Sequence, residues 1–207
     1  MIDPTESIID TYDIIADAYV AKYGEDATDK QHVDLLLKNL PYKAEILDAG
    51  CGAGQNAYHM ARKGFRVTGI DLSRSMLTIA KNHYSNCTFV YMDIRRLQFP
   101  PQRFDGILSS FSLIHIPDDT IPAVLSDFYR ILKPGGWAAI FAQQGKPDHY
   151  VDEPFAPGKK IFFNFFTKKR ITEKLKEAGF SSISIQSEHC DDTYNMSDTN
   201  LYILAKK

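Results

Sequence analysis

Three glycines at every second position are the first residues in this sequence whose type and spacing point to chemistry. Gly50, Gly52 and Gly54 lie in the segment ILDAGCGAGQN, between an apolar run and a helical pattern. Glycines between a strand and a helix allow backbone N–H groups to come close to a ligand. The spacing differs from the G-x-G-x-x-G pattern that holds a pyrophosphate, because Gln55 stands where the last glycine would fall. The segment therefore predicts a ligand-binding turn that does not match the pyrophosphate pattern.

Two acidic residues near this turn favour particular ligand groups. Asp48 lies two residues before Gly50, where a carboxylate would repel a pyrophosphate and would suit a cationic ligand. Asp71 closes the second apolar segment, in VTGIDLS, and an acid at such a position can accept hydrogen bonds from both hydroxyls of a ribose. Both acids also have a structural interpretation as turn residues. Since dinucleotide-binding and other adenosine-binding proteins share such an acid, Asp71 alone does not distinguish them.

A third acid, Asp93, closes the third apolar segment, in FVYMDIRRL. This arrangement suits an adenine ring, because the carboxylate can accept from the amino group while the N–H of Ile94 donates to a ring nitrogen. Leu72 and Met76 are placed to enclose the ring. Asp is also common after strands, and Met76 also fits a helical core stripe, so the structural interpretation stays open.

The elements that must position these residues alternate between strand and helix patterns. The expected strands are 45–49, 65–70, 88–92, 104–109, 137–142, 183–187 and 201–205. The expected helices are 5–23, 29–39, 55–63, 73–82, 118–131 and 167–179. Such alternation is typical of a parallel sheet covered on both faces, where ligands bind beyond the carboxyl ends of the strands. Asp48, Asp71 and Asp93 all fall at such ends.

Local signals set several boundaries between these elements. Ser73, Thr167 and either Asp118 or Asp119 are expected to cap helices. The sequence KPGG at 133–136 predicts a turn. Residues 144–166 are expected to form a long connection that holds a small apolar island, and connections of this length are commonly functional lids.

Composition excludes several classes of protein. The 207 residues are 44% hydrophobic, enough for the core of one domain, and the net charge of -2 argues against a general nucleic-acid binder. No run approaches the roughly 20 apolar residues of a membrane span, and the N-terminal residues lack the apolar core of a secretory signal. The three cysteines, Cys51, Cys87 and Cys190, suggest neither a disulfide framework nor a metal pair. A cytoplasmic protein without a metal is expected.

Taken in order, ILDAGCGAG, GIDLS, the Met-Asp pair at 92–93, FDGILSSFSLIHI and LKPGG resemble the motifs of class I S-adenosylmethionine-dependent methyltransferases. The resemblance covers about Glu45–Phe141, and the helix–strand–strand ending extends it. It implies a Rossmann-like α/β fold, with a seven-stranded, mostly parallel sheet of order 3-2-1-4-5-7-6, strand 7 antiparallel, and helices on both faces. It also implies a single domain over 1–207, with 1–41 as a helical cap and 144–166 as a substrate-side loop.

The resemblance implies S-adenosylmethionine as cofactor and S-adenosylhomocysteine as product. The three glycines would then approach the methionine part of the cofactor and Asp48 would lie near its amino group. Asp71 would hold the ribose, and Asp93 with Ile94 the adenine. The expected cofactor contacts are Tyr12, Tyr19, Asp48, Gly50, Gly52, Gly54, Asp71, Leu72, Met76, Asp93, Ile94 and Ser110.

Within that family, the chain is similar to small bacterial enzymes with YDxxAxxY near the start and SLLHVP after strand four. Here these motifs read as 12–19 and 112–117. Such enzymes usually methylate small molecules, and methyl transfer is an in-line displacement that needs alignment and exclusion of water rather than a protein nucleophile. His115 is the best candidate for a general base, with Tyr19 the second expected catalytic residue. Phe111, His115 and Phe163 are expected to contact the acceptor.

Two other functions stay open at this stage. A nicotinamide-dependent oxidoreductase would share the glycine turn and Asp71, although the missing glycine, Asp48 and the short chain argue against it. A non-catalytic protein that binds S-adenosylmethionine would keep the same cofactor residues. A nucleic-acid substrate is less favoured, because SSFS stands after strand four in place of an Asn-Pro-Pro-Tyr type sequence. The expected state is a monomer or a homodimer.

Overall fold

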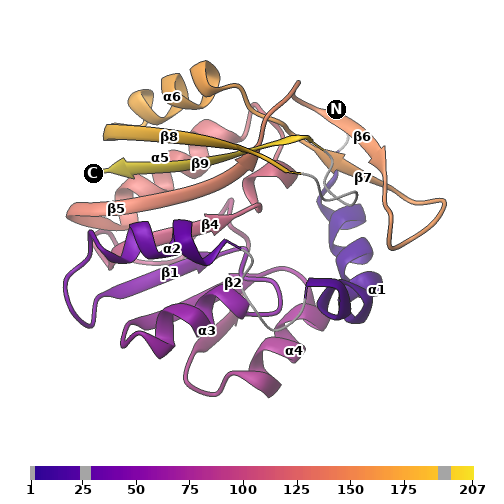
Figure 1. Ribbon diagram of the computed structural model, residues 1–207, viewed down its shortest axis with the longest axis horizontal. Helices are drawn as coiled ribbons and strands as arrows, with labels where there is room; N and C mark the ends of the chain where they lie inside the picture. The colour runs from indigo at the N-terminus through magenta and orange to yellow at the C-terminus, as the bar shows by residue number, and fades with distance from the viewer. Residues whose placement is uncertain (1–2, 24–28, 191–196) are drawn as a thin grey trace.

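Seven strands form one sheet in the computed structural model, which describes residues 3–23, 29–190 and 197–207 (Figure 1). In spatial order they are β3 (Thr88–Tyr91), β2 (Arg66–Asp71), β1 (Glu45–Ala49), β4 (Phe104–Ser110), β5 (Leu132–Gln143), β9 (Thr199–Lys206) and β8 (Ser181–His189). β1 to β5 pair in parallel, and β9 runs antiparallel to both β5 and β8. Counting β8 and β9 as the sixth and seventh sheet strands, the order is 3-2-1-4-5-7-6. The predicted topology is confirmed.

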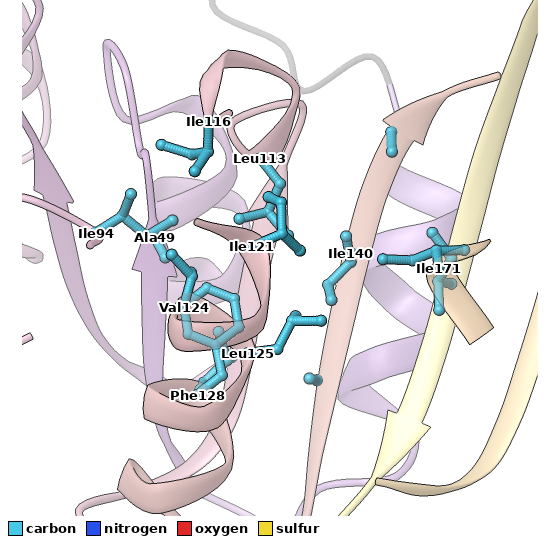
Figure 2. Close-up of a cluster of buried hydrophobic side chains, with 14 of the residues drawn as sticks. Ala49, Ile94, Leu113, Ile116, Ile121, Val124, Leu125, Phe128, Ile140 and Ile171 are labelled. Atoms are coloured by element: carbon cyan, nitrogen blue, oxygen red, sulfur yellow. The ribbon is translucent and has the colours of Figure 1, made fainter. Parts of the chain in front are cut away.

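Helices cover both faces of this sheet. They are α1 (Thr5–Tyr23), α2 (Lys30–Leu37), α3 (Gln55–Arg62), α4 (Arg74–His83), α5 (Ile121–Ile131) and α6 (Lys168–Glu177), with a 3-10 turn η1 (Leu113–His115). One hydrophobic cluster joins α2, α3 and α4 to the sheet, and a second joins α5 and α6 to the other face. In Figure 2 the α5 side chains Val124, Leu125 and Phe128 lie opposite strand residues such as Ile140. Among helices formed by described residues, none is both long and apolar enough to cross a membrane.

Helix α1 lies outside these two layers, beyond the carboxyl ends of the parallel strands (Figure 1). It packs against α4 on the sheet body. One oxygen of the Asp13 carboxylate accepts hydrogen bonds from the Ser73 hydroxyl at 2.6 Å and from the Ser75 N–H at 3.0 Å. These bonds outweigh the effect of burial and lower the pKa of Asp13. Asp13 therefore fixes α1 to the start of α4, directly after β2.

The segment expected as a long connection, 144–166, instead contains a β-hairpin, so that expectation is wrong. β6 (His149–Asp152) pairs antiparallel with β7 (Lys160–Phe163), with Tyr150 opposite Phe162. The apolar island, 161–163, lies in β7 and is buried throughout, and Ile161 and Phe163 belong to the main hydrophobic cluster. Two strands of four residues each are too short to give a clear period-two pattern, which is why the sequence did not reveal them.

The residues KPGG at 133–136 do not form the turn that the sequence predicts between α5 and the next strand. β5 starts at Leu132 and continues through these residues. Its pairing with β4 shifts register there, from Phe104 opposite Leu132 to Gly106 opposite Trp137. Gly135 adopts φ +77°, a left-handed conformation that glycine accommodates without a Cβ penalty. The expected turn is thus a bulge inside the strand.

Two of the expected helix caps are confirmed. The Ser73 hydroxyl accepts a hydrogen bond from the N–H of Met76 at 3.1 Å, at the start of α4. The Thr167 hydroxyl accepts one from the N–H of Arg170 at 3.2 Å, at the start of α6. Each bond satisfies one of the backbone donors left open in the first turn of a helix.

The expected cap of α5 by Asp118 or Asp119 is wrong. Thr120 occupies the capping position, without a side-chain hydrogen bond to the helix. The Asp118 carboxylate instead forms ion pairs with Arg170 at 3.4 Å and Lys174 at 3.3 Å. The side chain of Asp118 therefore ties the start of α5 to α6.

Candidate active site

A cavity of about 670 Å³ lies at the carboxyl ends of the parallel strands, between the glycine turn, α1 and the β6–β7 hairpin. Its volume lies in the range of sites for small molecules and cofactors. The wall contains every predicted site residue except Asp48 and Gly54. It includes Tyr12, Tyr19, Gly50, Gly52, Asp71, Leu72, Met76, Asp93, Ile94, Ser110, Phe111, His115 and Phe163. The structure therefore brings these predicted residues together in one cavity from segments far apart in the chain.

The three glycines of the turn have different surroundings. A Cβ added to Gly50 would lie 2.3 Å from Cβ of Ser112, and one added to Gly54 would lie 2.9 Å from Cζ of Phe89. These two positions permit close packing within the protein. Gly52 has φ +51° and nothing within 4 Å of an added Cβ, and it lines the cavity. Gly52 is thus the glycine that leaves space next to the ligand side of the turn.

The carboxylate of Asp71 is held by two backbone donors and lies in the cavity wall. One oxygen accepts from the Ser73 N–H at 2.9 Å, and the other accepts from the Gly52 N–H at 2.8 Å. Burial raises the pKa of Asp71, and these hydrogen bonds partly oppose that effect. Since each carboxylate oxygen can accept a second hydrogen bond, the arrangement fits two adjacent hydroxyls of a ribose.

Asp48 lies behind the turn rather than in the cavity wall. It is 1% exposed, and neither carboxylate oxygen makes a hydrogen bond of normal geometry with the described residues. Burial, reinforced by the negative charge of Asp71, raises the pKa of Asp48 to about 7. A carboxylate in this condition fits a positively charged ligand group nearby, which would favour its ionised form.

The expected adenine subsite contains an ion pair that sequence reasoning missed. Arg95 donates to the Asp93 carboxylate from Nη2 at 2.7 Å and from Nε at 3.0 Å, and its Nη1 donates to Asp3 at 2.9 Å. The two acids thereby hold the guanidinium beside the cavity. A basic residue two positions after a strand-end acid is the signal that could have indicated this pair. Leu72, Met76 and Ile94 line the same part of the cavity.

Tyr12 and His115 form a hydrogen-bonded pair in the cavity wall. The Tyr12 hydroxyl lies 2.8 Å from Nε2 of His115, and Nδ1 of His115 lies 3.0 Å from the carbonyl oxygen of Phe162. A carbonyl oxygen only accepts, so Nδ1 carries the proton and the neutral ring accepts the Tyr12 O–H at Nε2. Burial lowers the pKa of His115 to about 4. The imidazole is therefore neutral near neutral pH, with its lone pair engaged by Tyr12.

The remaining predicted acceptor contacts lie near this pair. The ring centroid of Phe163, on β7, is 4.9 Å from that of His115. Ser110 and Phe111 come from the end of β4, and Phe111 has φ +50°, which is uncommon for a residue with a side chain. The Phe111 N–H donates to the Phe141 carbonyl at 2.9 Å, which holds this conformation. Phe111, His115 and Phe163 thus share one cavity.

The wall residues that were not singled out from the sequence include Tyr23, Glu153 and Phe155. The Tyr19 ring centroid lies 6.1 Å from that of Tyr12, 4.6 Å from that of Tyr23 and 6.1 Å from that of Phe155. Glu153 follows β6 directly and is buried. A lone acid in a proline-containing loop has no local pattern that signals a site. Among the described residues, no group of three or more potential ligands is placed to hold a metal ion.

The fold is that of an α/β protein with a cavity at the strand ends, and comparisons with known proteins identify the family. A family model described as a methyltransferase domain matches residues 46–136. The Bacillus subtilis (strain 168) protein YqeM, whose name proposes a methyltransferase activity, is 38% identical over 214 residues, covering 82% of this chain and 86% of that protein. Phosphoethanolamine N-methyltransferase 1 of Zea mays is 33% identical over 175 residues, covering 82% of this chain and 34% of that protein.

Solved structures share the fold. The 1,6-didemethyltoxoflavin-N1-methyltransferase of Burkholderia thailandensis has a TM-score of 0.79 and 22% identity, covering 100% of this chain and 91% of that chain. Phosphoethanolamine N-methyltransferase 2 of Haemonchus contortus has a TM-score of 0.73 and 22% identity, covering 94% of this chain and 57% of that chain. The chain spans about a third of the length of the plant phosphoethanolamine N-methyltransferases that it matches. It belongs to the class I S-adenosylmethionine-dependent methyltransferase family.

Proposed function

We propose that this chain transfers the methyl group of S-adenosylmethionine to a small-molecule acceptor. The observation that carries the proposal is that one cavity joins the candidate ribose site, at Asp71 and Gly52, to the Tyr12–His115 pair. A cofactor and an acceptor would therefore share a single cavity. When bound, the cofactor supplies a methyl group on a sulfonium, which is a strong electrophile.

The cofactor is proposed to lie along the carboxyl ends of β1, β2 and β3. Gly52 would leave room for the methionine part, and Asp71 would accept the ribose hydroxyls. Asp93 and Ile94 would bind the adenine edge, with Leu72 and Met76 on its faces. The free acceptor positions of Asp71 and the open space at Gly52 support this placement.

The protein's contribution to the reaction is proposed to be alignment and exclusion of water. α1 and the hairpin lie over the strand ends, so a bound acceptor would be enclosed between them. Nε2 of His115 accepts a hydrogen bond from the Tyr12 hydroxyl. The lone pairs of the phenol oxygen then point toward other donors. Because the pKa of His115 is low, this histidine is better suited to orient Tyr12 than to keep a proton from the acceptor. Tyr19 stands beside Tyr12 and completes the wall.

The proposal is tested by product formation. Purified protein is incubated with S-adenosylmethionine and pools of small amines, alcohols, thiols and carboxylic acids. We expect S-adenosylhomocysteine to form together with one methylated acceptor, detected as the mass gain of a methyl group. A protein that binds S-adenosylmethionine but forms no S-adenosylhomocysteine with any pool would favour the non-catalytic binding role. Methylation only of a protein or an RNA would contradict the small-molecule acceptor.

A further inference from the structure

A buried carboxylate, Glu153, lines the cavity without a cationic partner among the described residues. It stands at the base of the hairpin loop, where its N–H donates to the Lys159 carbonyl at 2.9 Å and its carbonyl accepts from the Ala156 N–H at 3.1 Å. Its Oε1 accepts from the Phe155 N–H at 3.0 Å. Glu153 is 7% exposed, lines the cavity and forms no ion pair with a described residue. Because an unpaired buried carboxylate is costly, this position favours a positively charged ligand.

Glu153 also lies within electrostatic reach of the Tyr12–His115 pair. Burial is the largest cause of the raised pKa of Tyr12, and the negative charges of Glu153 and Asp71 raise it further. Tyr12 is therefore influenced by the candidate ribose carboxylate and by Glu153 together. Glu153 lines the same cavity as Tyr12 and His115, and its carboxylate is held beside Phe155 by the Phe155 N–H.

Three aromatic rings surround the same part of the cavity. Tyr19 lies 4.6 Å from Tyr23 and 6.1 Å from Phe155, and Tyr23 lies 6.2 Å from Phe155, measured between ring centroids. The rings are tilted or edge-to-face, so they form a corner rather than a stack. Aromatic faces attract ammonium ions, and Nζ of Lys22 already lies 5.9 Å from the Tyr23 centroid.

The charges in the described wall are mostly negative. Five acids face two bases there: Asp29, Asp71, Asp93, Glu153 and Glu188 against Lys22 and Arg95. Arg95 is bound to Asp93 and Asp3. An anionic group such as a phosphate ester would meet repulsion in this wall, whereas a cation would be attracted.

We propose that the methyl acceptor is a basic amine, bound by the Glu153 carboxylate and the faces of Tyr19, Tyr23 and Phe155. This inference rests on the proposed function and specifies its substrate class. In the transfer, the nitrogen lone pair forms the new bond to the methyl carbon while the carbon–sulfur bond breaks. The sulfonium becomes a neutral thioether, and the positive charge passes to the nitrogen. An amine that arrives protonated must first release one proton, and Glu153 is the carboxylate placed to accept it.

The charge requirement can be measured without turnover. Protein saturated with S-adenosylhomocysteine is titrated calorimetrically with choline and with its neutral carbon isostere, 3,3-dimethylbutan-1-ol. The two probes have the same shape, so they differ only in the ammonium charge. We expect choline to bind at least about tenfold more tightly than the isostere.

Variants assign that preference to the proposed groups. Glu153→Gln should weaken choline binding about tenfold while leaving the affinities for the isostere and for S-adenosylhomocysteine unchanged. Phe155→Leu should weaken choline binding in the same direction. Asp152→Asn is the matched control, because it removes a carboxylate from the adjacent position of the same hairpin whose side chain is 85% exposed. Thermal unfolding checks that each variant folds. If Glu153→Gln does not fold, the choline affinity of Phe155→Leu tests the proposal instead.

Each outcome bears on one claim. Equal binding of choline and its isostere to the wild-type protein, no measurable choline binding, or unchanged choline binding by Glu153→Gln would overturn the amine proposal alone. If the wild-type protein binds neither S-adenosylmethionine nor S-adenosylhomocysteine, the proposed function itself fails, and the amine proposal fails with it.

Discussion

The hydroxyl of Tyr12 donates a hydrogen bond to Nε2 of His115 at 2.8 Å, although the two residues lie 103 positions apart in the chain. The bond connects α1 to the turn that follows β4, across the mouth of the cavity. Because Nδ1 of the same imidazole donates to the hairpin carbonyl of Phe162, His115 joins three segments that line the cavity. We therefore propose that the pair contacts the acceptor, which differs from the sequence-based expectation of Tyr12 as a cofactor contact.

Replacing Tyr12 by phenylalanine removes the hydroxyl and keeps the ring. We expect kcat to fall about 10- to 100-fold, since leaving a buried hydrogen-bonding group unpaired costs on the order of 1–3 kcal/mol. The affinity for S-adenosylhomocysteine should stay within about threefold of wild type, measured by calorimetry. Tyr42→Phe is the control, because Tyr42 is 81% exposed and away from the cavity. A Tyr12→Phe enzyme with unchanged kcat would remove this hydroxyl from the reaction.

Replacing Asp71 by alanine should weaken cofactor binding by about 1–3 kcal/mol, the usual cost of leaving hydrogen-bonding groups unpaired. Asp71→Asn should lose less, because its side-chain oxygen can still accept one hydrogen bond. Calorimetric titration with S-adenosylhomocysteine measures both. Asp17→Asn, an exposed carboxylate on α1, serves as the comparison. Identical affinities for wild type and Asp71→Ala would contradict the ribose assignment.

The stability of the cofactor-free protein should depend on pH through Asp48. Its pKa rises from 3.8 to about 7 on folding, so the folded state binds more protons than the unfolded state between these values. The free energy of unfolding should therefore fall as pH increases from about 4 to about 7. Asp48→Asn should remove this part of the slope, which urea unfolding at about pH 5 and about pH 8 would detect. If wild type and variant show the same pH dependence, Asp48 is not the cause.

Releasing α1 from α4 should weaken cofactor binding without altering any proposed cofactor contact. Asp13→Ala removes the acceptor of the Ser73 and Ser75 hydrogen bonds, and we expect the cofactor affinity to fall several-fold. Deleting residues 1–27 should have a larger effect in the same direction. Fluorescence or calorimetric titration measures both variants, with Asp10→Ala as the control because Asp10 is an exposed residue of α1. Unchanged affinity in the deletion would show that α1 does not close over the cofactor.

Much of the site could be predicted because its residues stand at the ends of local elements. The glycine turn, Asp71 and Asp93 each follow a strand, and parallel strands bring their carboxyl ends to one edge. The cap formed by Ser73 also follows from a short local pattern. Asp48 and Gly54 were expected in contact with the cofactor, and the structure places both outside the cavity wall. Sequence position alone does not distinguish the two sides of a turn.

The missed features depend on contacts between distant segments. The hairpin strands β6 and β7 are too short for a periodic signal, and Glu153 gains its significance only from burial beside α1. Asp118 is of a residue type that favours helix caps, but its ion pairs with α6 determine the position of its side chain. The prediction of a helical cap over 1–41 includes 1–2 and 24–28, which lie outside the described residues. Within the described part, α1 lines the cavity and α2 packs on the sheet face.

The central claim is tested most directly by titrating the purified protein calorimetrically with S-adenosylmethionine, S-adenosylhomocysteine, NAD and NADP in parallel. We expect the protein to bind the two sulfur compounds with micromolar affinity and to bind neither nicotinamide cofactor. Asp71→Ala should bind both sulfur compounds more weakly. Binding of a nicotinamide alone would mean that the glycine turn serves a dinucleotide, and it would contradict methyl transfer at this site.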